Sequence, residues 1–190
     1  MSNDDPTQQG MPPWEPPFHG TENEHLAGML DRLRTTFRWK ADGLDDDGLR
    51  FTLPTSALSL GALLKHLAVC EDDVFGWRIA GERPDVMADM PEGADLFAWQ
   101  WELPDDPADV YALYDAAVER SRARLAVILD AGRLEAPGHL TFGEIRPSIR
   151  RHVCDLVEEY GRHTGHADLI REALDGRVGE DPPDEWRPVS

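Results

Sequence analysis

The chain has 190 residues, and its 37 acidic against 19 basic residues give a net charge of −18. The length suits one domain, and a hydrophobic content of 41% is enough for a packed core. A surface this acidic repels the phosphate backbones of nucleic acids. No apolar run is long enough to span a membrane, and residues 1–10 lack the basic and apolar regions of a signal peptide. We therefore expect a soluble, cytoplasmic protein without nucleic-acid or membrane partners.

Composition divides the chain into a helical domain between two tails. Prolines through residues 1–20 exclude a helix there, while the aromatic residues between them predict that this N-terminal tail packs on the domain. Residues 21–176 carry the helical patterns. Residues 177–190 form an acidic, proline-containing C-terminal tail with a single aromatic anchor, Trp186.

The first predicted helix begins at a capping box, in which Thr21 and Glu24 each satisfy a free backbone N–H group. Apolar residues then recur at helical spacing as far as Phe37, and the helix should end near Gly43. Residues 44–58 follow as an acidic connection.

The second predicted helix is capped by Ser59 and runs to about Ala80, where Gly81 ends it. Residues 82–104 then form a long crossover rich in Pro and Asp. A loop of that length in a compact domain is often functional, for example as a lid or the wall of a cleft.

Two further helices complete the pattern. The third has Asp106 as its expected N-cap, with Pro107 at the first helical position, and stops before Gly132. The fourth is capped by Ser148 and ends at Gly176. Four amphipathic helices and no convincing set of strands predict an all-α four-helix bundle with long crossover connections.

Three polar residues share one flank of the last predicted helix. At about 100° per residue, Glu159, His163 and His166 fall within roughly 60° of one another, at the edge of the apolar face. Spacings of four and three residues place these side chains on adjacent turns, as in the metal sites of helix bundles. A carboxylate with imidazoles suits Zn²⁺, Ni²⁺ or Fe²⁺ rather than Ca²⁺.

A further ligand should come from a facing helix, and His66 lies at the corresponding edge of the second helix. His163 and His166 form an HxxH pair, which by itself is more typical of surface or hydrogen-bonded histidines. The hypothesis of a metal site therefore depends on Glu159 and His66 lying beside this pair. His152 is interpreted as structural or solvent-facing. The two cysteines, Cys70 and Cys154, are interpreted as small buried apolar residues.

Four segments occur together: PPWEPP at 12–17, LSLGALLKHL at 58–67, EEYGRHTGHADL at 158–169, and the Asp175-Gly176 ending. In this combination the chain resembles the DinB-like superfamily, specifically its DUF664 branch, over about residues 12–187. The resemblance implies a DinB-like four-helix bundle, often a homodimer, with a divalent metal at its open end.

The resemblance also implies which residues would bind the metal. The superfamily uses one histidine from the second helix and an H-x3-H pair from the last, and here Glu159 replaces the first of that pair. Mycothiol-dependent maleylpyruvate isomerase, a relative, likewise has Glu-x3-His at this place. The ligands then map to His66, Glu159 and His163, with His166 as a neighbour. Helix geometry leaves open a second set, made of His66, His163 and His166.

Members of the superfamily with known activity are often thiol-dependent transferases. The resemblance thus implies a metal-dependent S-transferase, with zinc foremost and nickel or iron as alternatives, that joins a small thiol such as mycothiol to an electrophile. Two other hypotheses stay open. One is a non-catalytic metal- or ligand-binding bundle for stress response, and the other is a structural or dimerisation protein whose polar residues hydrogen-bond one another.

Overall fold

The computed structural model of the chain describes residues 11–12, 14–88 and 90–188, and within these residues it is helical with no named strand. The all-α class is therefore confirmed. The longer elements are α1 (Glu22–Ala41), α3 (Leu60–Asp72), its π-helical continuation η1 (Asp73–Ala80), α5 (Asp109–Asp130) and α6 (Ile149–Asp175). The short ones are α2 (Asp46–Arg50), η2 (Asp85–Met87) and α4 (Leu96–Trp99).

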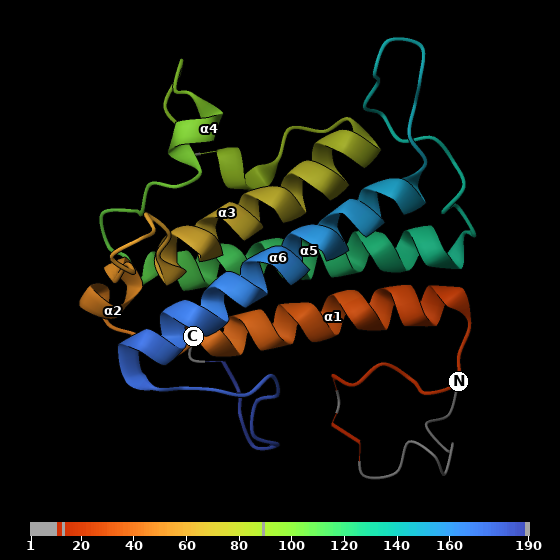
Figure 1. The fold of residues 1–190 in the computed structure, drawn as a ribbon. Helices are drawn as coiled ribbons and strands as arrows, with labels where there is room; N and C mark the ends of the chain where they lie inside the picture. The colour runs from red at the N-terminus through yellow and green to blue at the C-terminus, as the bar shows by residue number, and fades with distance from the viewer. Residues whose placement is uncertain (1–10, 13, 89, 189–190) are drawn as a thin grey trace.

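The four long helices pack as two close pairs. α1 lies along α6, and α3 lies along α5 (Figure 1). Contacts between α3 and α6 join the two pairs, and this α3–α6 seam carries the polar residues discussed below. No helix of the described residues is long and apolar enough to cross a membrane.

Most helix ends lie where the capping signals predicted them. Thr21 and Glu24 form the expected capping box, and Ser59 and Ser148 accept backbone N–H groups from the first turns of α3 and α6. Gly176 ends α6 in the left-handed region at φ 80°, which only glycine adopts without strain. Local side-chain chemistry therefore sets these boundaries.

One predicted helix start was wrong, and one predicted connection contains a short helix. α5 begins at Asp109 rather than Pro107, because the Asp106 carboxylate accepts the N–H of Ala108 and holds a turn ahead of the helix. The connection at 44–58 contains the short helix α2, whose N-terminus is capped by Asp45.

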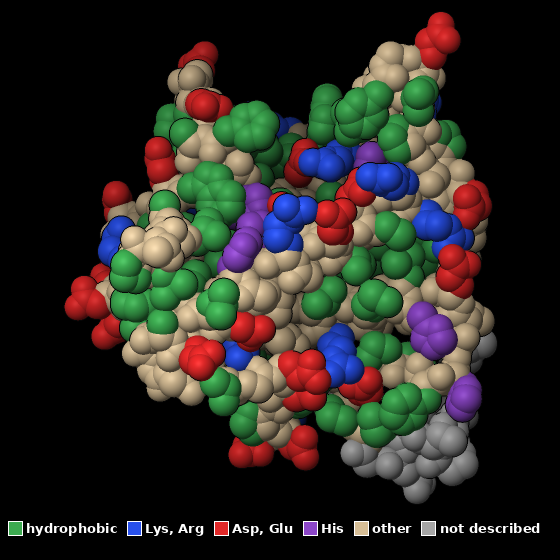
Figure 2. Space-filling view, in the orientation of Figure 1, with side chains coloured by type: hydrophobic (Ala, Val, Ile, Leu, Met, Phe, Trp, Pro, Cys, Tyr) green, Lys and Arg blue, Asp and Glu red, His purple; other side chains and the backbone are tan. Residues whose placement is uncertain are grey.

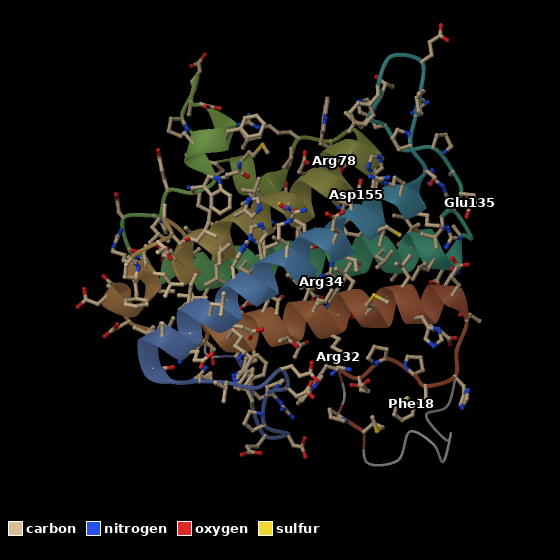
Figure 3. All side chains as sticks on the ribbon, viewed as in Figure 1. Phe18, Arg32, Arg34, Arg78, Glu135 and Asp155 are labelled. Carbon is tan, nitrogen blue, oxygen red and sulfur yellow. The ribbon has the colours of Figure 1, made fainter. Side chains whose placement is uncertain are left out.

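A buried polar cluster joins all four long helices. Arg34 of α1 (Figure 3) donates two hydrogen bonds of 2.7 Å to the carboxylate of Glu71 on α3. The hydroxyl of Tyr160 on α6 donates to the same carboxylate at 2.7 Å. The hydroxyl of Tyr114 on α5 lies 3.0 Å from the hydroxyl of Tyr160. Burial alone would lower the pKa of Arg34, but the facing Glu71 carboxylate raises it above its usual value.

Both tails contact the helical domain where they are described. Trp14 is almost fully buried, and the indole N–H of Trp186 donates to Asp42 at 2.9 Å. Residues 1–10, 13 and 189–190 of the predicted tails lie outside the described residues. Two segments project from the bundle in Figure 2: the crossover around α4 and the loop at 136–148.

Candidate metal centre

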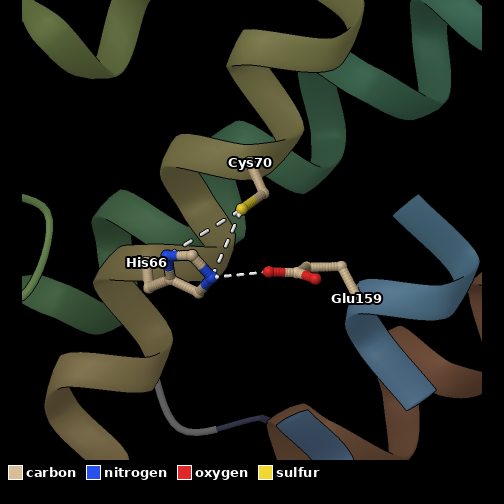
Figure 4. A group of neighbouring side chains, drawn as sticks. All are labelled: His66, Cys70 and Glu159. Carbon is tan, nitrogen blue, oxygen red and sulfur yellow. Dashed lines mark hydrogen bonds and ion pairs between the residues drawn. The ribbon is translucent and has the colours of Figure 1, made fainter. Parts of the chain in front are cut away.

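Three of the predicted site residues come together at the α3–α6 seam. His66 of α3 and Glu159 of α6 face each other across the seam, with 3.1 Å between Nε2 and Oε1 (Figure 4). Nε2 of His163, one turn further along α6, lies 3.4 Å from the same Oε1. Both imidazoles are buried, while the Glu159 side chain is 33% exposed, so the cluster lies just below the surface.

The long crossover contributes two contacts to His66 that the sequence analysis did not assign. The side-chain oxygen of Gln100 accepts a hydrogen bond from Nδ1 of His66 at 3.0 Å, and the Gln100 amide group donates to the carbonyl of Phe97 at 3.5 Å. The indole of Trp101 stacks on the His66 ring, with 4.2 Å between centroids and 13° between planes. The crossover thus holds this imidazole in one orientation.

The Gln100 contact decides which nitrogen of His66 carries a proton. An amide oxygen only accepts hydrogen bonds, so Nδ1 must be the donor. In the neutral ring, Nε2 then presents a lone pair to the Glu159 carboxylate 3.1 Å away. Two acceptors at that distance repel unless a positive charge lies between them, which either a second proton on His66 or a metal ion can supply.

The electrostatics of the cluster favour the metal-binding forms of its residues. Burial, followed by the neighbouring imidazole of His66, lowers the pKa of His163 to about 4. Burial would raise the pKa of Glu159, but the two facing imidazoles lower it below its usual value. At neutral pH, His163 is therefore a neutral imidazole and Glu159 an anion, the states in which both can bind a cation.

Cys70 also belongs to this cluster, which corrects its interpretation as a buried apolar residue. One ligand atom from each of His66, Cys70 and Glu159 lies within 4.8 Å of the other two, and the sulfur is 3.5 Å from Nε2 of His66. Burial raises the pKa of Cys70, so it is a thiol at neutral pH. The other cysteine, Cys154, is exposed. The four-residue spacing between His66 and Cys70 was a signal available in the sequence.

The other two histidines of α6 occupy different surroundings. His166 lies against the far side of the His163 ring, with 3.3 Å between the two Nδ1 atoms, whereas Nε2 of His163 faces Glu159. His152 is buried, and its ring nitrogens have no hydrogen-bond partner among the described residues. Burial lowers the pKa of His152, which keeps the ring neutral.

Comparison with known proteins gives one match. The family model for mycothiol-S-transferases matches residues 25–176. This span includes α3, α5 and α6 and every residue of the cluster. Searches of the curated proteins and of the solved structures found no match.

Proposed function

The chain belongs to the mycothiol-S-transferase family, and we propose that it is a divalent-metal-dependent enzyme that joins a low-molecular-weight thiol, such as mycothiol, to an electrophile. We further propose that His66, Glu159 and His163 bind the metal. The observation that carries the proposal is the convergence of two imidazole Nε2 atoms on one carboxylate oxygen, at 3.1 and 3.4 Å.

The chemistry of these side chains fits a catalytic zinc site. Two histidines and one carboxylate are a recurrent catalytic zinc ligand set, which leaves a coordination position open. A bound zinc ion would stabilise the thiolate form of a thiol at neutral pH, and the thiolate is the nucleophilic form. The position of His166 beyond the His163 ring supports a neighbouring role for it rather than direct binding.

The surrounding residues hold the proposed ligands in place before any ligand binds. Gln100 keeps the proton of His66 on Nδ1, so Nε2 stays free to bind. Trp101 covers one face of the His66 ring and shields it from water. Because Gln100 and Trp101 both come from the crossover, movement of that segment would change the orientation of His66.

Metal analysis tests the proposed ligands directly. The chain is stripped with a chelator and titrated with Zn²⁺, alongside His66→Ala, Glu159→Gln, His163→Ala and the matched variant His166→Ala. We expect one zinc per wild-type chain, a loss of affinity of more than about 100-fold in the first three variants, and near-normal binding in His166→Ala. Stoichiometric zinc in all four variants would overturn the site.

Turnover separates an enzyme from a binding protein. The zinc-loaded chain is incubated with mycothiol and a fluorogenic haloalkyl electrophile, and conjugate formation is measured against His163→Ala. We expect conjugate formation that depends on both zinc and His163. Tight zinc binding without turnover with mycothiol, bacillithiol or glutathione would instead indicate a non-catalytic metal-binding bundle.

A further inference from the structure

Lys65 and His66 are neighbours on α3, and between them they contact four consecutive residues of the long crossover, at 99–102. His66 contacts the two middle residues, as described above. Lys65 contacts the two outer ones. Its ammonium group donates a hydrogen bond of 2.7 Å to the backbone carbonyl of Glu102, and it lies 3.8 Å from the centre of the Trp99 ring. The segment that orients His66 is therefore held at both ends by the side chain next to His66.

The position of Lys65 is an unfavourable one for a charge. Lys65 is only 5% exposed, and the two contacts of its ammonium group are a carbonyl and an aromatic ring rather than a carboxylate. Burial of a charge costs free energy unless strong partners compensate for it, and a methionine of similar length would avoid that cost. A buried lysine that contacts the crossover in this way indicates that the crossover needs the ammonium group.

Apolar packing holds only part of the crossover. A cavity of about 490 Å³ separates the crossover from α3 and α5, with Lys65 and Trp99 among its lining residues. Helix α4 projects from the bundle in Figure 1, and the side chain of Phe97 on this helix is 78% exposed. Close packing on α3 begins at Leu103, since a Cβ atom at Gly61 would lie 2.7 Å from the Leu103 side chain. Ahead of Leu103, the contacts of Lys65 therefore bridge a gap that side chains do not fill.

The contacts of Lys65 reach the candidate metal centre through one backbone turn. The N–H group of Glu102 donates to the carbonyl of Trp99 at 3.1 Å, so the two residues that Lys65 contacts are also bonded to each other. Gln100 lies between them in the chain and accepts the hydrogen bond from Nδ1 of His66. A shift of this turn away from α3 would carry the Gln100 acceptor away from the ring.

We propose that Lys65 is a positioning residue of the candidate metal centre. By holding the turn at 99–102 against α3, it keeps Gln100 on Nδ1 of His66, and Nε2 of that ring stays free to bind a metal ion. Lys65 acts on His66 only through the crossover. The proposal rests on the proposed function, because that function makes His66 a metal ligand.

Two measurements on the metal-free chain test whether Lys65 holds the turn and orients the ring. Hydrogen exchange reports on the backbone amides of residues 96–103, and two-bond ¹H–¹⁵N NMR spectra at pH 8 report which ring nitrogen of His66 carries the proton. In Lys65→Met we expect exchange in this segment to rise about tenfold, and we expect His66 to lose its preference for a proton on Nδ1. If either reading is unchanged, the proposal is overturned.

Matched variants separate this role from the loss of any buried lysine. Lys40, the other lysine of the chain, is 1% exposed, lies 4.9 Å from the centre of the Trp39 ring and pairs with Asp168 of α6 at 2.9 Å. Lys40→Met should leave both readings unchanged. Lys65→Arg should keep both close to the wild type, because a guanidinium group also donates to carbonyls and stacks on indoles. Changes in Lys40→Met as large as those in Lys65→Met would overturn the assignment.

Zinc affinity connects this role to the proposed function. Lys65→Met should lower it about tenfold, as the loss of a group that orients a ligand does, and Lys40→Met should not. Trp99→Leu removes the ring but keeps the lysine, so it should raise exchange by a smaller factor. If Lys65→Met does not fold, unchanged exchange in Trp99→Leu would overturn the proposal. Because exchange and the tautomer are measured without metal, a wild-type chain that binds no zinc would refute the proposed function alone.

Discussion

Two polar clusters lie on the same pair of helices but face different surroundings. Cys70 and Glu71 are neighbours on α3, and Glu159 and Tyr160 are neighbours on α6. Successive residues of a helix point about 100° apart, so one of each pair faces the core and the other faces the α3–α6 seam. Glu71 and Tyr160 are fully buried, whereas Cys70 and Glu159 line a pocket of about 240 Å³ at the seam.

The difference lies in how well the polar groups are satisfied. In the core cluster, both carboxylate oxygens of Glu71 accept hydrogen bonds from Arg34, and Tyr160 adds a third. At the seam, the Nε2 atoms of His66 and His163 both face one oxygen of Glu159, at 3.1 and 3.4 Å, and the Glu159 side chain remains one-third exposed. A satisfied buried cluster stabilises the fold, whereas metal-ligand types that converge just below the surface indicate a binding site.

The largest effect should come from breaking the core cluster. Glu71→Gln keeps the shape of the side chain but leaves the buried Arg34 with only the half-exposed Asp31 as its counter-charge, which should cost about 3 kcal/mol of unfolding free energy. Urea unfolding measures it, with the exposed Glu158→Gln as the control, since that ion pair with Arg162 contributes less than about 1 kcal/mol. A loss as small as the control's would mean that the core cluster is not structural.

The next largest effect should be on zinc affinity at the α3–α6 seam, without a change in the stability that the core cluster provides. Gln100→Leu removes the acceptor for Nδ1 of His66, so the ring loses its fixed tautomer and orientation. We expect zinc affinity to fall about 10–100-fold, with urea unfolding of the metal-free chain unaltered. Phe97→Ala, a change of an exposed side chain in helix α4 just before Gln100, is the control. Unchanged affinity in Gln100→Leu would show that the crossover does not orient His66.

Acid should weaken the seam cluster through His163. Its pKa is about 4 in the folded chain and about 6.5 when unfolded, so between these values the unfolded state binds more protons and stability falls as pH falls. From pH 7 to pH 5 the loss should be about 1–2 kcal/mol in the metal-free chain. The lowered pKa of Glu159 acts in the same direction at lower pH.

His163→Gln tests this assignment. Urea unfolding of the variant and of the wild type is measured at pH 7 and pH 5 in the presence of a chelator. The variant should lose the part of the pH dependence that lies between pH 5 and pH 7. If both chains respond equally to acid, the dependence arises elsewhere in the molecule.

The smallest effect should follow from Cys70→Ser. The sulfur is close to His66, but the proposed ligand set does not include it. We expect zinc affinity to change by less than about threefold, or roughly 0.6 kcal/mol. Competition with a chromophoric chelator measures the change. A loss as large as that in His163→Ala would make Cys70 a ligand and close the coordination position left for a thiol.

The sequence predicted the positions of the helices more accurately than the contacts between them. Capping residues such as Ser59 and Ser148 act on backbone groups within one turn, so the ends that they set could be read without the fold. The start of α5 was misplaced because Asp106 can cap a turn as well as a helix. The π-helical winding of η1 was not predicted, because its residues read as an ordinary continuation of the helix before it.

By itself, the sequence determined that Glu159, His163 and His166 share a flank, because helical periodicity is a local property of the backbone. Only the tertiary structure brought His66 to Glu159 and turned the two Nε2 atoms toward one oxygen. The path of the crossover over α3 also decided that Gln100 and Trp101 contact His66. These contacts join residues up to 93 positions apart, and no local pattern records which of them will meet.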